Sequence, residues 1–161
     1  MNDVTYRYMT LDDLPHIMLI EQDAFSVPWT KEAFENELTN NQLAHYMAVE
    51  YDGVVIGYGG LWLIAGEAHI TNIAIHSVYR GRGLGKQLVQ QLIRTAAVLG
   101  ANKMTLEVRV KNVVAQHVYR QFGFVEAGIR PKYYADNDED ALIMWADIDD
   151  SRDVRVRNGE K

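Results

Sequence analysis

The sequence contains no cysteine, only three prolines and no long hydrophobic run. Without cysteine there can be no disulfide framework, no thiolate zinc site and no cysteine nucleophile. No apolar stretch approaches the roughly 18 residues that a membrane-spanning helix needs, and the first residues lack the basic and apolar regions of a signal peptide. We therefore expect a cytoplasmic protein that does not associate with membranes.

The remaining composition is that of a globular protein. The chain has 161 residues, of which 48% are hydrophobic and 24% are charged, and this length is sufficient for one domain with a substantial core. The net charge of −6 argues against a protein that mainly grips nucleic-acid phosphates. A compositional break near the C-terminus predicts one domain over residues 1–150 and a polar, flexible tail over residues 151–161.

Strand and helix signals alternate along the chain. Alternating or apolar segments predict strands over residues 4–9, 46–50, 54–58, 69–75, 104–108 and 141–146 and near Val125. Helical apolar spacing predicts helices over residues 10–24, 30–38 and 84–99, and the cap residue Asn112 with the closing Gly123 predicts a helix over residues 112–121. A capping box at Thr10 and a cap at Thr30 support two of the helix starts, and Trp29 and Phe34 have the spacing of a hydrophobic staple. Gly100 is expected to end the helix over residues 84–99, and Asp52-Gly53 is a favoured hairpin turn. Together these signals predict a mixed α/β domain.

The most informative segment, residues 73–86, reads as a strand, a glycine-rich turn and the start of a helix. Alternate glycines leave backbone N–H groups accessible, and a helix N-terminus carries partial positive charge, so the segment favours a phosphate. Its glycines and basic side chains are Gly81, Gly83, Gly85, Arg80, Arg82 and Lys86.

Two familiar phosphate loops do not fit this segment. A dinucleotide fingerprint needs a third glycine where Lys86 stands, and a Walker loop needs Ser or Thr where Gln87 stands. The pattern Arg80-x-x-Gly83-x-Gly85 instead matches the pyrophosphate loop of the GNAT acetyltransferases. The alternative is a glycine-rich turn with solvated arginines.

The chain resembles the GNAT N-acetyltransferases over about residues 4–148. Within this superfamily it is most similar to the bacterial ribosomal-protein-alanine N-acetyltransferases, the RimI type. Besides the glycine-rich segment, the similarity rests on residues 24–29, 106–112 with 119–124, and 133–134 with 139–144. The resemblance implies a single GNAT-type α/β domain, in which helices flank a mixed central β-sheet that splays at the acetyl-CoA site.

The resemblance also implies acetyl-CoA as donor and assigns residues to it. The expected donor-binding residues are Ile73, Ala74, Ile75, Arg80, Gly81, Arg82, Gly83, Leu84, Gly85, Lys86, Asn112 and Tyr119. No metal is expected, because the five histidines lack a ligand spacing.

The resemblance assigns Glu107 as general base and Tyr119 as general acid. An N-terminal amine has a pKa of about 7.7–8.0, so it must lose a proton before it attacks the thioester. The leaving thiolate benefits from a proton donor. We predict that partial burial raises the pKa of Glu107, or that Glu107 acts through water. Because no cysteine can carry the acetyl group, direct transfer is favoured. A solvated Glu107 and a Tyr119 that only packs in the core are the structural alternatives.

The implied acceptor is the N-terminal alanine of a small-subunit ribosomal protein. The expected acceptor-binding residues are Phe25, Pro28, Trp29, Glu107, Tyr133 and Tyr134, although the aromatic residues could serve packing alone. Four acids at positions 136–140 could steer a basic partner or form an ordinary solvated loop. Other acceptors remain open: a lysine side chain, another protein N-terminus or a small amine. So does a binding module that senses acetyl-CoA without catalysis. Nucleic-acid binding is disfavoured by the charge.

Overall fold

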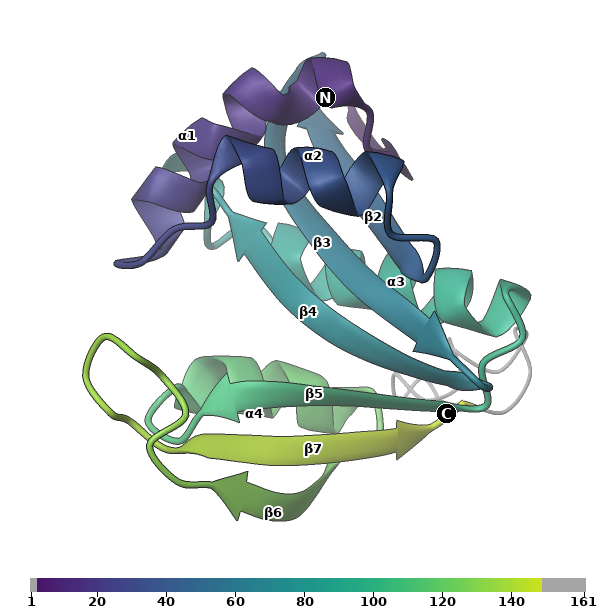
Figure 1. The fold of residues 1–161 in the computed structure, drawn as a ribbon, viewed down its shortest axis with the longest axis vertical. Helices are drawn as coiled ribbons and strands as arrows, with labels where there is room; N and C mark the ends of the chain where they lie inside the picture. The colour runs from purple at the N-terminus through teal and green to yellow at the C-terminus, as the bar shows by residue number, and fades with distance from the viewer. Residues whose placement is uncertain (1–2, 149–161) are drawn as a thin grey trace. The chain divides into compact units, whose positions relative to one another are not determined.

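The computed structural model of the chain describes residues 3–148. The predicted tail over residues 151–161 and the ends of the predicted domain over residues 1–150 lie outside the described residues. Within this part the strands and α-helices follow the predicted order, with two short 3-10 helices added. The elements are β1 (Val4–Tyr8), η1 (Leu11–Asp13), α1 (Leu14–Ala24), α2 (Lys31–Thr39), β2 (Ala44–Tyr51), β3 (Val54–Ile64), β4 (Glu67–Ile75), η2 (Ser77–Tyr79), α3 (Leu84–Val98), β5 (Lys103–Arg109), α4 (Val113–Gln121), β6 (Val125–Arg130) and β7 (Ala141–Asp147) (Figure 1).

The strands form a mixed sheet in the order β1-β2-β3-β4-β5-β7-β6. The pairs β1–β2, β2–β3, β5–β7 and β6–β7 are antiparallel, whereas β4 and β5 are parallel. The parallel ladder runs only from Glu67↔Lys103 to His69↔Thr105, although β4 has nine residues and β5 has seven. The predicted fold class is therefore confirmed, with a single mixed and open sheet and flanking helices.

The chain divides into two compact units, which we describe separately. The first comprises Met1–Trp62 and Thr71–Leu92, and the second comprises Leu63–Ile70 and Ile93–Lys161. In the first unit, α1 and α2 cover one face of β2 and β3 (Figure 1). Side chains alternate across a strand, so Tyr58 on β3 points toward these helices, whereas Gly59 points to the face where Leu88 and Leu92 of α3 lie.

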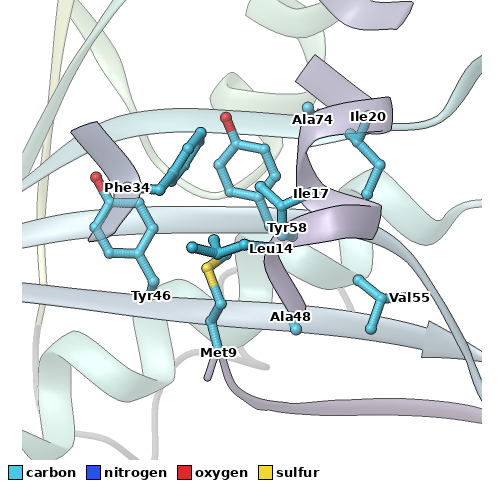
Figure 2. Close-up of a cluster of buried hydrophobic side chains, with 10 residues drawn as sticks. All are labelled: Met9, Leu14, Ile17, Ile20, Phe34, Tyr46, Ala48, Val55, Tyr58 and Ala74. Atoms are coloured by element: carbon cyan, nitrogen blue, oxygen red, sulfur yellow. The ribbon is translucent and has the colours of Figure 1, made fainter. Parts of the chain in front are cut away.

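The core of the first unit is built from α1, α2 and the strands beneath them. Leu14, Ile17 and Ile20 recur along α1 at helical spacing and are at most 1% exposed. They pack with the fully buried rings of Phe34 and Tyr58 (Figure 2). The rings of Phe34 and Tyr58 meet edge-on with centroids 5.5 Å apart, an arrangement that aromatic rings prefer.

The two N-terminal helices begin as the sequence predicts. Thr10 and Asp13 form the expected capping box, which opens a 3-10 turn before α1, and Pro15 lies in the first turn of α1. The hydroxyl of Thr30 accepts the backbone N–H of Ala33 and caps α2. The rings of Trp29 and Phe34 lie 5.2 Å apart, which confirms the predicted hydrophobic staple.

Two tight turns connect β2, β3 and β4. The predicted turn contains Asp52 and Gly53, whose φ angles of 52° and 84° are both positive, as a favoured hairpin turn requires. A second turn of the same kind, at Ala65 and Gly66, was not predicted. Because β3 continues to Ile64, the apolar residues 61–64 belong to the same strand as the hairpin.

In the second unit, β5, β7 and β6 lie side by side with α4 against one face (Figure 1). Met104, Leu106 and Val108 of β5 are buried, as the alternating pattern predicts. Thr105, Glu107 and Arg109 therefore share the other face of the strand. None of the helices within residues 3–148 is long and apolar enough to cross a membrane.

Candidate functional site

The glycine-rich loop in the first unit joins η2 to the N-terminus of α3. Gly81 and Gly83 have φ angles of 81° and 80°, which residues with a side chain rarely adopt. Gly81, Arg82, Gly83 and Lys86 are exposed to solvent. The first N–H groups of an α-helix have no acceptor within the helix, so the loop presents donors and cations to an anion.

Arg80 is anchored at the entrance to this loop. Its Nε donates to the carbonyl of Ile75 at 2.9 Å, and its Nη2 lies 3.6 Å from Asp23 of α1. Asp23 also accepts the backbone N–H and the hydroxyl of Ser77, at 2.8 and 2.7 Å. These hydrogen bonds hold the pKa of Asp23 below its ordinary value. The end of β4 is therefore tied to α1 on the carboxyl side of the strand.

Arg82 lies over two tyrosine rings. Its guanidinium is 5.4 Å from the ring centre of Tyr51 and 5.5 Å from that of Tyr79, and its Nη1 donates to the hydroxyl of Tyr51 at 2.9 Å. Cation–π contacts of this kind restrict a long side chain. The positive charge of Arg82 is therefore held beside the glycine-rich loop.

The predicted donor strand, Ile73–Ile75, is the last part of β4. Ala74 and Ile75 are buried, whereas Ile73 is partly exposed. Gly57 on β3 allows a close approach to this strand, because a Cβ there would lie 2.9 Å from the carbonyl oxygen of Ala74. The short helix η2 then connects the end of β4 to the glycine-rich loop.

The predicted acceptor residues Phe25, Pro28 and Trp29 connect α1 to α2. Phe25 and Trp29 are partly buried against the core of the first unit, whereas Pro28 is exposed. Glu21 of α1, which is only 1% exposed, accepts the backbone N–H of Trp29 at 2.8 Å and the hydroxyl of Tyr58. Burial raises the pKa of Glu21, although both hydrogen bonds oppose this effect.

A chain of side-chain hydrogen bonds leads from Tyr58 to the start of the donor strand. Asn72 donates to the Tyr58 hydroxyl at 3.0 Å, and Thr71 donates to Asn72 at 2.8 Å. The hydroxyls of Thr71 and Tyr46 lie 3.2 Å apart, and Tyr46 donates to the buried carboxylate of Glu37 at 2.9 Å. This polar network joins both N-terminal helices to β4.

In the second unit, the predicted base Glu107 lies between two basic side chains. Its Oε1 is 2.7 Å from Nε2 of His69, and its Oε2 is 3.5 Å from Nε of Arg130. Burial alone would raise the pKa of Glu107, but the hydrogen bond and charge of His69, with the charge of Arg130, outweigh it and lower the pKa. The prediction of a raised pKa is therefore wrong, because the sequence did not reveal these two partners.

Tyr119 and Asn112 belong to α4 and its cap. Tyr119 packs on Phe124 with ring centres 5.8 Å apart, and burial raises its pKa to about 12, which keeps the hydroxyl protonated at neutral pH. Among the described residues no hydrogen bond joins Tyr119 to Glu107. The side-chain oxygen of Asn112 accepts the N–H of Ala115 at 3.2 Å and so caps α4.

Tyr133 and Tyr134 lie in the loop between β6 and β7, with their rings edge-on and 5.0 Å apart. Arg109 of β5 lies 4.0 Å from the ring centre of Tyr134. The same guanidinium contacts both oxygens of Asp136, at 3.1 and 2.9 Å, and Glu139 at 3.1 Å. Two of the four acids that could steer a basic partner are thus paired with Arg109 of β5.

Sequence reasoning missed His69, Arg130, Arg109 and Glu21. Strand alternation places His69 on the same face of β4 as Thr71, but its approach to Glu107 depends on the register between β4 and β5. That register pairs His69 with Thr105, two residues before Glu107. Local sequence patterns do not specify such a pairing between distant segments.

The donor set of the glycine-rich loop fits a pyrophosphate, because exposed backbone N–H groups, a helix N-terminus and three cations meet there. Within residues 3–148 there is no group of three or more His, Asp or Glu side chains that could hold a metal ion. The arrangement is that of a phosphate-binding loop beside an open mixed sheet.

This fold and loop define an acyltransferase of the acetyl-CoA-dependent kind. The acetyltransferase (GNAT) family matches residues 14–124. The chain therefore belongs to this family, whose members use acetyl-CoA as donor, and is an N-acetyltransferase.

Two relatives and one solved structure show which members of the family the chain is similar to. A Bacillus subtilis (strain 168) protein is 46% identical over 144 residues, and the match covers 89% of this chain and 95% of the relative's length. That protein is provisionally named a ribosomal protein bS18-alanine N-acetyltransferase. The Escherichia coli (strain K12) protein named as that enzyme is 35% identical over 144 residues, covering 87% of this chain and 95% of its own. The crystal structure of the ribosomal-protein-S18-alanine N-acetyltransferase from Escherichia coli superposes with a TM-score of 0.82 at 32% identity, covering 92% of this chain and 94% of that one.

Proposed function

We propose that the protein transfers the acetyl group of acetyl-CoA to the N-terminal alanine of ribosomal protein bS18. The main support for this proposal is sequence identity of 46% and 35% to two relatives that are named for this activity. The matches extend over nearly the full length of those relatives. The family alone does not select this acceptor.

Three groups of residues bind the two substrates in this proposal. Arg80 and the loop over residues 81–86 hold the pyrophosphate of the donor, and the backbone of residues 73–75 with Asn112 holds the rest of it. The connection over residues 25–29 and the pair Tyr133 and Tyr134 line the acceptor side. Apart from the buried Leu84, the residues of the loop, Asn112 and the acceptor side are exposed or partly exposed, which supports these roles. Ala74 and Ile75 are buried and would contribute only backbone groups.

Glu107 and Tyr119 perform the proton transfers. Glu107 is ionised at neutral pH and can receive a proton from the acceptor ammonium, directly or through water. Tyr119 stays protonated because burial raises its pKa to about 12, so it can donate to the departing sulfur. The amine nitrogen then attacks the thioester carbonyl, and the acetyl group passes directly to it.

The test uses the purified full-length protein, acetyl-CoA and a peptide with the N-terminal sequence of bS18. Mass spectrometry should locate one acetyl group on the terminal amine, with stoichiometric release of CoA. Matched acceptors are the same peptide with a blocked N-terminus, an internal-lysine peptide and a polyamine. Acetylation of the blocked or lysine peptide at an equal rate would contradict the terminal-amine acceptor.

The catalytic roles need separate variants. Glu107→Gln and Tyr119→Phe each preserve shape and should lower kcat by about 10²–10⁴-fold, the usual contribution of a general acid or base. The KM for acetyl-CoA should change little in Glu107→Gln. A variant that keeps wild-type kcat would remove that residue from the mechanism without affecting the acceptor assignment.

A further inference from the structure

The sequence assigned no role to His69, yet its imidazole is hydrogen-bonded to Glu107, the proposed base. His69 is the last paired residue of β4 in the parallel ladder, opposite Thr105 of β5. Glu107 lies two residues further along β5 and on the same face. The resulting Nε2–Oε1 distance of 2.7 Å is that of a strong, charge-assisted hydrogen bond.

The groups around this pair come from neighbouring parts of the second unit. Arg130 on β6 lies 3.5 Å from the other oxygen of Glu107. Tyr133 and Tyr134 lie in the loop that follows. Burial raises the pKa of both tyrosines and the negative charge of Glu107 adds to this rise, whereas Arg130 opposes it at Tyr133 and Arg109 opposes it at Tyr134. On β7 the residue opposite Glu107 is the apolar Ile143.

In this environment Glu107 alone has too low a proton affinity to take a proton efficiently from the acceptor ammonium. A carboxylate with an ordinary pKa near 4.3 binds a proton roughly 2,500–5,000-fold less tightly than an amine of pKa 7.7–8.0. His69 and Arg130 lower the pKa of Glu107 and so widen that difference. Imidazole is the side chain whose ordinary proton affinity suits acid–base work near neutral pH.

We infer that His69 and Glu107 accept the acceptor's proton as one bonded pair, with His69 as the positioning residue that completes the base. The inference rests on the proposed function, because it assumes an ammonium acceptor at Glu107. The N–H bond of the ammonium breaks and its electrons stay on nitrogen. Because Nε2 already donates its hydrogen to Oε1, the proton ends on Nδ1 of the imidazole, and the pair becomes an imidazolium–carboxylate ion pair. The net charge of the pair rises from −1 to zero.

The exposed fractions of the two side chains fit a carboxylate that receives the proton and an imidazole that holds it. The carboxylate of Glu107 is only 10% exposed, whereas the imidazole of His69 is 34% exposed. A proton stored on the pair can therefore leave through the imidazole after transfer, while the carboxylate remains sheltered. Interacting groups of this kind titrate in macroscopic steps that belong to the pair.

The pH dependence of kcat separates the pair from a lone Glu107. The decisive variant is His69→Gln, because the amide can still donate a hydrogen bond to Oε1 but does not titrate. If the pair is the base, replacing His69 removes one of the two groups that can hold the proton, so the acid limb of kcat moves to lower pH. If Glu107 acts alone, the acid limb moves to higher pH, because the pKa of Glu107 rises when His69 is gone. His16→Gln, on the exposed side of α1, is the matched control and should keep the wild-type profile.

A second measurement needs no acceptor. Carbon-13 NMR of the glutamate carboxyls in the wild type and in His69→Gln should show the pKa of Glu107 rising in the variant, while both proteins retain the same circular dichroism. An unchanged Glu107 titration, or an acid limb that stays or moves upward, would overturn the inference. If the wild type does not acetylate the bS18 peptide, the proposed acceptor fails. The same kinetic comparison is then made with whichever lysine peptide or polyamine is acetylated.

Discussion

Replacing Tyr58 with phenylalanine should destabilise the fold through the polar network under the N-terminal helices. The Tyr58 hydroxyl donates to the carboxylate of Glu21 and accepts from Asn72 at 3.0 Å. Tyr58 is fully buried and Glu21 is 1% exposed, so water cannot replace the lost bond without rearrangement. A hydrogen bond to a charged group contributes about 1.5–3 kcal/mol, and the second bond adds less because Asn72 is partly exposed. The expected loss is about 2–4 kcal/mol.

The loss should also depend on pH, because the pKa of Glu21 is raised in the folded protein. A group of this kind contributes stability that is fully present below its unfolded pKa and is lost as the pH rises through its folded pKa. The Tyr58 hydrogen bond opposes the raised pKa, so Tyr58→Phe raises it further, and the deficit should grow from pH 5 to pH 8.

Urea unfolding at several pH values measures this deficit from the midpoint, with an unchanged m-value. Tyr8→Phe is the matched control, since Tyr8 is 55% exposed. A loss below about 0.5 kcal/mol, or a loss that is equal at all pH values, would refute the role given to this hydroxyl.

Three further predictions concern other parts of the chain. Gly83→Ala forces a φ of 80° on a residue with a Cβ, although no atom lies within 4 Å of that Cβ; stability should fall by about 1–2 kcal/mol and the KM for acetyl-CoA should rise in steady-state kinetics. Arg109→Lys cannot contact Asp136, Glu139 and the ring of Tyr134 together, so the KM for the acceptor should rise several-fold while that for acetyl-CoA stays constant. Arg7→Met leaves the buried Asp13 without its bidentate partner and should cost about 2–4 kcal/mol at pH 7. Because Arg7 lowers the pKa of Asp13, that cost should shrink as thermal unfolding is measured at falling pH, and a constant cost would count against the ion pair.

Local signals in the sequence predicted most of the fold. The caps at Thr30 and Asn112, the turn at Asp52 and the helix stop at Gly100 depend on neighbouring residues, and each occupies the predicted position. The glycine-rich loop was recognisable for the same reason, since its chemistry lies in seven consecutive residues.

Local sequence signals could not predict which side chains surround the site residues. The pKa of Glu107 depends on His69 and Arg130, which lie 38 residues before it and 23 residues after it in the chain. Its direction was predicted wrongly because burial could be guessed from the strand pattern, whereas the two partners depend on strand register. Whether residues 25–29 and 133–134 hold the acceptor stays a prediction.

The loop that carries Tyr133 and Tyr134 is held by Arg109, and this has a consequence for redesign. The guanidinium contacts two acids and one ring of the same loop, while Asp140 accepts the backbone N–H of Lys132 and closes the loop on itself. Residues 131–140 are therefore held by Arg109 of β5 and by the chain just after it, where the N–H of Lys111 donates to Glu139 and the N–H of Val110 donates to the carbonyl of Asp140. An exchange of the acceptor-side loop between relatives should succeed when the graft includes Asp136 and Glu139 together, and a graft limited to the two tyrosines should not.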